Sequence, residues 1–266
     1  MTVLDWREVK VSVWEPAAGV GAQVVLLALL AAGAGLYPVA LLVGAAYAVI
    51  VCGVLAGAMS RSRTPLGPAG RVTLTRAVLV GGVTALVTMN LIGRETPVAF
   101  LVALAAVALA LDAVDGHVAR RTGTESALGA RFDMEIDAFL ILVLSVNVSR
   151  SLGAWVLLIG LMRYGFAAAA WVAPWLRAPL PPSFARKTVA AAQGILLVAV
   201  SSGLFPPLAA LALAGLALGS LSWSFGRDIL WLWRNRPAHA ISSPLAESGA
   251  LAEIRQPYHQ SGIRAR

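Results

Sequence analysis

Eight long apolar segments follow one another along this 266-residue chain, and their length constrains the fold more than any other feature. A helix needs about 20 consecutive apolar residues to cross a bilayer. Only 13% of the residues are charged, whereas a soluble domain has about 25%. The apolar runs are continuous rather than alternating, which favours helices over a β-barrel. We therefore expect an all-α integral membrane protein, with spans at residues 17–34, 38–59, 73–92, 96–118, 126–149, 152–175, 184–203 and 206–233.

The positive charge of the chain is distributed unevenly between the two ends of these spans. The net charge of +8 comes from 21 Lys and Arg residues against 13 acidic residues. In a membrane protein this excess indicates cations at the cytosolic membrane edge and contact with membrane lipids, not a nucleic-acid partner. One side of the predicted spans has only Arg94 and Arg150, so we expect both termini in the cytosol and a multi-pass protein of the cell membrane. The other side collects Arg7, Lys10, Arg61, Arg63, Arg71, Arg120, Arg121, Arg177, Arg186, Lys187, Arg234 and Arg236.

Four carboxylates within 26 residues are the main candidates for function. Asp112 and Asp115 are spaced i,i+3, and Asp133 and Asp137 are spaced i,i+4, so each pair shares one face of a helix. A short turn near residues 120–124 joins the two helices, which places both pairs at a similar depth near the cytosolic boundary. Four like charges cannot crowd beside an apolar core without a counter-ion. An all-carboxylate set suits Mg²⁺ or Mn²⁺ better than zinc, and the single Cys52 argues against a thiolate site or an internal disulfide.

Small and basic residues accompany these acids. Gly116 and Gly129 allow either a bulky ligand or a neighbouring helix to approach the backbone. The small side chain of Ala119 allows the same two kinds of approach. Arg120 can anchor the helix at the membrane edge or contact a phosphate.

Together these residues form the pattern DxxDGxxAR, eight residues, then GxxxDxxxD. This pattern resembles the signature of the CDP-alcohol phosphotransferase (CDP-alcohol phosphatidyltransferase) family. All of its fixed positions are matched, by Asp112, Asp115, Gly116, Ala119, Arg120, Gly129, Asp133 and Asp137.

The resemblance implies a fold and a division of the chain. The family core has six transmembrane helices, so this chain would have two extra helices before it. We expect a cytosolic amphipathic lead-in without a cleavage site, the two extra helices, a cytosolic linker, a six-helix catalytic core and a polar, disordered tail. These parts would cover residues 1–16, 17–59, 60–72, 73–234 and 235–266.

The resemblance also implies a reaction, in which a substituted phosphate moves from a CDP-linked donor to an alcohol with release of CMP. Asp112, Asp115 and Asp133 would bind metal, Mg²⁺ or Mn²⁺ and two ions in all. Asp137 would be a further ligand or the catalytic base. The CDP pocket would be lined by Gly116, Ala119, Arg120 and Gly129.

The identities of donor and acceptor do not follow from the motif. CDP-diacylglycerol is the favoured donor, although another CDP-alcohol fits the same pattern. The acceptor would be a small alcohol or an alcohol phosphate, and the enzyme would act in phospholipid biosynthesis. A homodimer is compatible with the helix-contact pattern of Gly215 and Gly219.

Four cations outside the motif are candidates for binding a phosphate or an anionic acceptor: Arg76, Arg163, Arg186 and Lys187. Arg76 opens the first core span and can face the site or anchor the helix at the interface. Arg163 lies well inside an apolar run, where a cation needs a partner. Topology alone explains Arg186 and Lys187 equally well. Glu135 lies off the face shared by its acidic neighbours, and we do not expect it to be a ligand.

Two other functions are compatible with acids in membrane helices. An intramembrane prenyltransferase also binds a diphosphate through Mg²⁺, but the DxxDG spacing and the absence of a second Asp-rich motif argue against it. An ion-coupled transporter can use aspartates as a relay. The lack of an obvious inverted repeat and the confinement of the acids to one hairpin argue against a transporter.

Overall fold

The computed structural model describes residues 14–63, 66–122, 126–181 and 183–235, and for residues 113–122 it describes the backbone alone. Every element in this part of the chain is helical. The first five are α1 (Trp14–Ala34), α2 (Pro38–Ser62), α3 (Gly67–Leu91), α4 (Val98–Thr122) and α5 (Ala127–Leu152). The remaining elements are η1 (Ala154–Val156), α6 (Leu157–Val172), η2 (Pro174–Arg177), α7 (Phe184–Ser201) and α8 (Pro207–Arg234).

The all-helical prediction is confirmed for the described residues. Most expected spans coincide with one long helix, whereas the span expected at 152–175 is divided into η1, the 16-residue α6 and η2. Six helical segments of the described chain are long and apolar enough to cross a membrane: Trp14–Ala34, Pro38–Ser62, Gly67–Leu91, Ala154–Val172, Phe184–Ser201 and Pro207–Arg234. Helix α5 was expected as a span but falls outside this set, because charged residues lie toward both of its ends. In α4 the described side chains cover only the apolar stretch Val98–Asp112, which is shorter than a full span.

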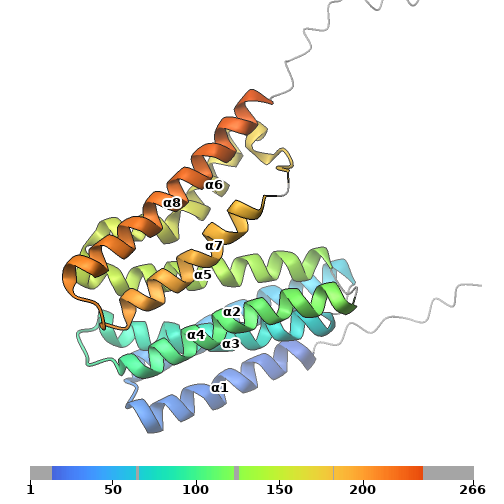
Figure 1. The fold of residues 1–266 in the computed structure, drawn as a ribbon. Coiled ribbons are helices and arrows are strands. Elements are labelled where there is room, and N and C mark those ends of the chain that lie inside the picture. The colour runs from blue at the N-terminus through green and yellow to red at the C-terminus, as the bar shows by residue number, and fades with distance from the viewer. Residues whose placement is uncertain (1–13, 64–65, 123–125, 182, 236–266) are drawn as a thin grey trace, which may run out of the picture.

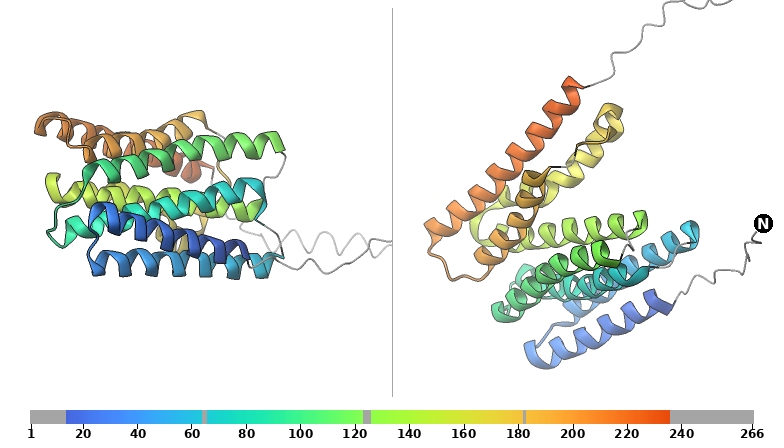
Figure 2. Two further views of the ribbon diagram at one scale, coloured as in Figure 1. Left: turned by 90° about the horizontal axis from the view of Figure 1, so that it is seen from below. Right: turned by 45° about the vertical axis from the view of Figure 1, so that its right-hand side comes forward.

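Helix α3 forms the centre of the molecule. It packs against α1, α2, α4 and α5, which lie side by side in Figures 1 and 2. Helices α6 and α8 lean away from this bundle, and α7 contacts both α5 and α8. The C-terminal end of α4 and the N-terminal ends of α3 and α5 lie together at one end of the bundle (Figure 1). A residue near the start of α3 can therefore reach acids on α4 and α5.

Close helix approach depends on glycine at specific positions. A Cβ atom on Gly160 of α6 would lie 2.5 Å from the Cα of Leu142 on α5. A Cβ atom on Gly81 of α3 would lie 2.3 Å from the Gln23 side-chain oxygen on α1. Membrane helices associate through such close packing because lipid tails provide no hydrophobic drive between helices.

Polar side chains join three helices at the end of the bundle away from the motif. Asn90 of α3 donates a hydrogen bond to the Asn147 side chain of α5 at 2.9 Å. Asn147 in turn donates to the hydroxyl of Ser201 on α7 at 3.2 Å. Interhelical hydrogen bonds of this kind stabilise membrane bundles by about 0.6 kcal/mol each. They hold α3, α5 and α7 together opposite the candidate site.

Candidate active site

The candidate site is built on the hairpin of α4 and α5. Ser126 caps α5, and its hydroxyl accepts a hydrogen bond from the backbone N–H of Gly129 at 2.9 Å. Ser is among the preferred N-cap residues because it satisfies one of the free N–H groups of the first turn. A Cβ atom on Gly129 would lie 3.0 Å from this hydroxyl. The cap therefore gives Gly129 a local role, in addition to the CDP contact predicted for it.

Three acids of the motif converge at this hairpin. One oxygen from each of Asp112, Asp133 and Asp137 can be chosen so that all three lie within 4.8 Å of one another. Asp112 comes from α4, and the i,i+4 spacing places Asp133 and Asp137 on the same face of α5. Their side chains are 31–40% exposed, so the cluster is open to a ligand.

The guanidinium of Arg76 lies against these carboxylates. Arg76 is fully buried on α3, and its Nε–H donates to the backbone oxygen of Ala108 on α4 at 3.1 Å. Its Nη1 pairs with Asp112 at 2.9 Å and also with Asp133, while Nη2 pairs with Asp137. The planar fork of arginine suits such multiple contacts. Arg76 therefore fixes three carboxylates from two helices around one buried cation.

The cluster suits a divalent cation in both charge and donor type. Three carboxylates and one guanidinium have a formal sum of −3 + 1 = −2, which one divalent ion would neutralise. Mg²⁺ and Mn²⁺ prefer oxygen ligands of this kind. Each carboxylate has two oxygens with several lone pairs, so contact with Arg76 does not exhaust its capacity to bind a metal.

The other predicted motif residues are placed only by their backbone. Asp115, Gly116, Ala119 and Arg120 lie on α4, but their side chains lie outside the described part of the chain. Their proposed roles in metal and CDP binding stay predictions. Glu135 is not part of the three-acid cluster, as expected.

The accessory cations occupy different environments. Arg163 of α6 forms an ion pair with Glu135 at 2.6 Å, apart from the three-acid cluster. Arg186, in the first turn of α7, contacts the backbone oxygen of Pro181 and pairs with Asp228 of α8 at 3.4 Å. Lys187 is exposed beside it. Gly215 and Gly219 have open space around them on α8, and a dimer contact there stays a prediction.

Two arginine contacts in this region were not predicted from the sequence. Arg76 faces the site, which was one of the two positions expected for it, but its partners are the motif aspartates. Arg227 was not considered, and its guanidinium donates to the Ser183 hydroxyl at 3.0 Å and lies 3.6 Å from Asp228. Both arginines gave a signal that could have been used, because a charged residue inside an apolar helix needs a partner.

A model of CDP-alcohol phosphatidyltransferase domains matches residues 69–223, more than half of the chain. The chain belongs to the CDP-alcohol phosphatidyltransferase family. The match includes Arg76 and the complete acidic motif, and it begins within α3, so α1 and α2 precede it. No curated relative and no solved structure matches the chain. The family indicates a membrane transferase that uses a CDP-alcohol donor and an alcohol acceptor, which disfavours the transporter and prenyltransferase alternatives.

Proposed function

We propose that this CDP-alcohol phosphatidyltransferase transfers the phosphatidyl group of CDP-diacylglycerol to an alcohol in phospholipid biosynthesis, releasing CMP. The observation that carries the proposal is the acidic cluster of Asp112, Asp133 and Asp137 around Arg76. A nucleotide diphosphate is an anionic ligand that such a cluster can bind only with added positive charge. The partly exposed carboxylates would provide the ligands for that charge.

In this proposal Asp112, Asp115, Asp133 and Asp137 would hold Mg²⁺ or Mn²⁺, two ions in all. When bound, the metal neutralises the diphosphate and stabilises the departing CMP. Arg76 holds the carboxylates of α4 and α5 in fixed positions relative to one another, which limits their movement during turnover. Gly116, Ala119, Arg120 and Gly129 line the CDP pocket.

Asp137 is the proposed general base. The acceptor hydroxyl gives its proton to this carboxylate while its oxygen bonds to the phosphorus that carries the lipid. The bond from that phosphorus to the bridging oxygen breaks, and CMP leaves with the electron pair. General-base assistance of this kind contributes about 10²–10⁴-fold to the rate. Asp137 can also be a metal ligand, because its carboxylate has two oxygens and the two roles are not exclusive.

An alcohol phosphate is the proposed acceptor class. Lys187, exposed in the first turn of α7, would supply positive charge for the acceptor phosphate, and Arg186 beside it would do so only in exchange for its ion pair with Asp228. The site would face the cytosol, where a phosphorylated alcohol is available and CMP can diffuse away. Arg163 takes no part in acceptor binding in this proposal because Glu135 already neutralises it.

The test is release of CMP by the purified protein in detergent or nanodiscs. The protein would be given CDP-diacylglycerol, Mg²⁺ or Mn²⁺, and a panel of free and phosphorylated alcohols. We expect metal-dependent CMP release with at least one acceptor and none without an acceptor. A folded sample that releases no CMP with any donor and acceptor would reject the proposal.

Asp133→Asn tests the site within the same assay. Asparagine keeps the shape and can still accept a hydrogen bond from Arg76, so the protein should fold. Loss of a metal-ligand charge should lower CMP release by at least about 100-fold. Glu95→Gln, an exposed acid in the turn between α3 and α4 at the opposite end of the bundle, is the matched control. Equal activity of the two variants would remove Asp133 from the metal site.

A further inference from the structure

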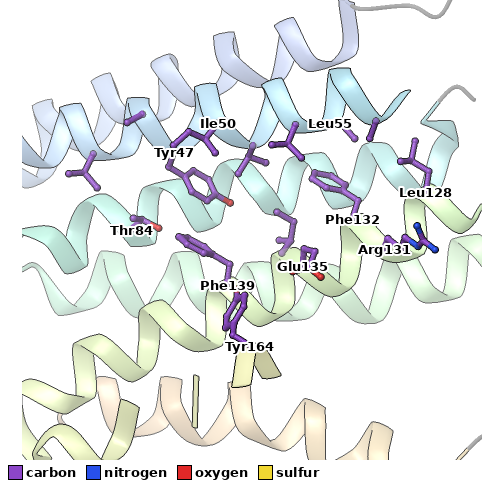
Figure 3. A pocket seen from close by; sticks show the side chains of 16 residues that line it. Tyr47, Ile50, Leu55, Thr84, Leu128, Arg131, Phe132, Glu135, Phe139 and Tyr164 are labelled. Atoms are coloured by element: carbon purple, nitrogen blue, oxygen red, sulfur yellow. The ribbon is translucent and has the colours of Figure 1, made fainter. Parts of the chain in front are cut away.

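A second cavity lies on the other side of α5 from the acidic cluster. It has a volume of about 650 Å³ and is bordered mainly by α2 and α5, and Thr84 of α3 and Tyr164 of α6 also line it (Figure 3). We call it the α2–α5 groove. Its walls are apolar over most of their length and include Val43, Val54, Leu128, Phe132 and Phe139.

The α2–α5 groove is separate from the catalytic face. At 3.6 residues per turn, the α5 residues that line the groove are centred about 150° around the helix from Asp133 and Asp137. Those two aspartates turn toward Arg76 on α3. A molecule in the groove is therefore not placed for phosphoryl transfer. The α2 wall of the groove also precedes the region that matches the family model.

The shape of the groove suits one extended hydrocarbon chain. The α5 wall from Leu128 to Phe139 covers 12 residues, or about 16 Å at a rise of 1.5 Å per residue. At the end of the groove farther from Arg131, the ring of Tyr47 stacks on that of Phe139, with ring centroids 5.0 Å apart (Figure 3). Several wall residues that point toward the surrounding bilayer are more than half exposed, including Ile50 and Val54. A lipid chain can thus enter sideways between the helices.

The outer end of the groove is cationic. Arg131 lies in the second turn of α5, is exposed, and makes no ion pair or hydrogen bond with another described residue. Glu135, one turn further along, is neutralised by Arg163 at 2.6 Å. Arg61 and Arg63 end α2, one turn beyond the groove residue Ala58. The net charge at this opening is positive, which complements an anionic lipid headgroup.

We propose that the α2–α5 groove binds one anionic glycerophospholipid as a non-substrate lipid. One acyl chain lies between α2 and α5, and the headgroup phosphate contacts Arg131. The lipid fills the space between an additional N-terminal helix and the core, so it ties α2 to α5 through apolar contact. This site does not depend on the proposed reaction.

The test uses the full chain in nanodiscs made of equal parts phosphatidylglycerol and phosphatidylcholine. Native mass spectrometry after transfer to detergent counts and identifies the lipid that stays bound. We expect one retained phosphatidylglycerol, favoured over phosphatidylcholine about fivefold or more because each cation at a membrane surface contributes to anionic lipid binding. Retention of no lipid by the wild-type protein would overturn the proposal.

Two variants and two controls localise the bound lipid. Ala46→Trp fills the groove and should abolish retention, whereas Val49→Trp, on the exposed side of α2 and outside the groove, should not. Arg131→Gln should remove the preference for phosphatidylglycerol, whereas Arg150→Gln in the last turn of α5 should keep it. Unchanged retention in Ala46→Trp, or an unchanged preference in Arg131→Gln, would overturn the site. Should Ala46→Trp fail to fold, Arg131→Gln alone decides the question.

Discussion

Arg76 shows how one residue can organise an entire site. Its side chain is fully buried, yet it contacts three carboxylates and a backbone carbonyl oxygen from two neighbouring helices. A buried cation is costly unless its partners surround it. The same contacts hold the three aspartates in place before any metal binds. Arg76 is thus both a structural counter-ion and a competitor for the carboxylate oxygens.

Arg76→Gln should separate these two effects. Removing a partner from a buried ion cluster typically destabilises a protein by about 3–5 kcal/mol, so the metal-free variant should unfold at a lower temperature. The three carboxylates would then lack their internal cation and should bind a divalent ion more tightly. We expect Mn²⁺ to raise the unfolding temperature of Arg76→Gln by more than that of the wild type.

The measurement is thermal unfolding in detergent over a Mn²⁺ titration. Arg76→Lys is the control, because lysine keeps the positive charge but lacks the planar guanidinium that contacts several carboxylates at once. Lysine should give a metal-dependent shift near that of the wild type. An equal Mn²⁺ shift in Arg76→Gln and the wild type would show that Arg76 does not compete with metal.

The role of Asp137 can be distinguished from that of Asp133 by the kinetics of single variants. As a base rather than only a ligand, it should affect turnover more than metal binding. Asp137→Asn is expected to lower CMP release by about 10²–10⁴-fold, while the Mn²⁺ concentration for half-maximal activity changes by less than it does in Asp133→Asn. A large rise in that Mn²⁺ concentration for Asp137→Asn would instead assign Asp137 to the metal.

At the scale of the helices, small residues decide how closely elements pack. Gly160 brings α6 against the backbone of α5, and α5 carries Asp133 and Asp137. Gly165 lies on the same helix with open space where its Cβ would be. The two glycines therefore form a natural pair for testing whether close packing of α6 supports the site.

Gly160→Ala should destabilise the protein, because its Cβ would lie 2.5 Å from the Leu142 Cα and overpacking costs about 1–3 kcal/mol. Gly165→Ala should be neutral or slightly stabilising, since Ala is favoured over Gly in a helix by about 1 kcal/mol. Thermal unfolding of both variants in the same detergent checks this. A similar stability for the two would show that the contact between α5 and α6 is loose.

At the scale of the whole molecule, the antiparallel helices bring the active-site hairpin and the end of α2 to the same end of the bundle (Figure 1). The turn between α3 and α4 lies at the opposite end. The excess of Arg and Lys at the motif end predicts that this end faces the cytosol. The orientation can be tested because the chain has a single cysteine, Cys52, which is buried.

In a Cys52→Ser background, Arg61→Cys should react with a membrane-impermeant maleimide only after the cells are permeabilised. Glu95→Cys, in the turn between α3 and α4, should react in intact cells. Both native residues are exposed, so access to the reagent depends on the side of the membrane. The reverse labelling pattern would contradict the predicted orientation and place the candidate site outside the cytosol.

Much of this architecture followed from the sequence. The long apolar runs predicted that the described chain is built from helices, because bilayer thickness sets the length of a span and backbone hydrogen bonds must be satisfied within it. The i,i+3 and i,i+4 spacing of the acids predicted shared helix faces, and the short turn predicted that the pairs would meet. The convergence of Asp112, Asp133 and Asp137 agrees with that local reasoning.

The remaining features depended on contacts between residues distant in sequence. Arg76 lies 57 and 61 positions from Asp133 and Asp137, and the chain of Asn90, Asn147 and Ser201 joins three separate helices. Periodicity cannot predict such partners, because it fixes which face a residue occupies but not which helix lies against that face. The sequence alone determined that the protein is helical and where its acids gather. The tertiary structure decided that a buried arginine balances those acids, and that the opposite face of α5 forms a groove with α2.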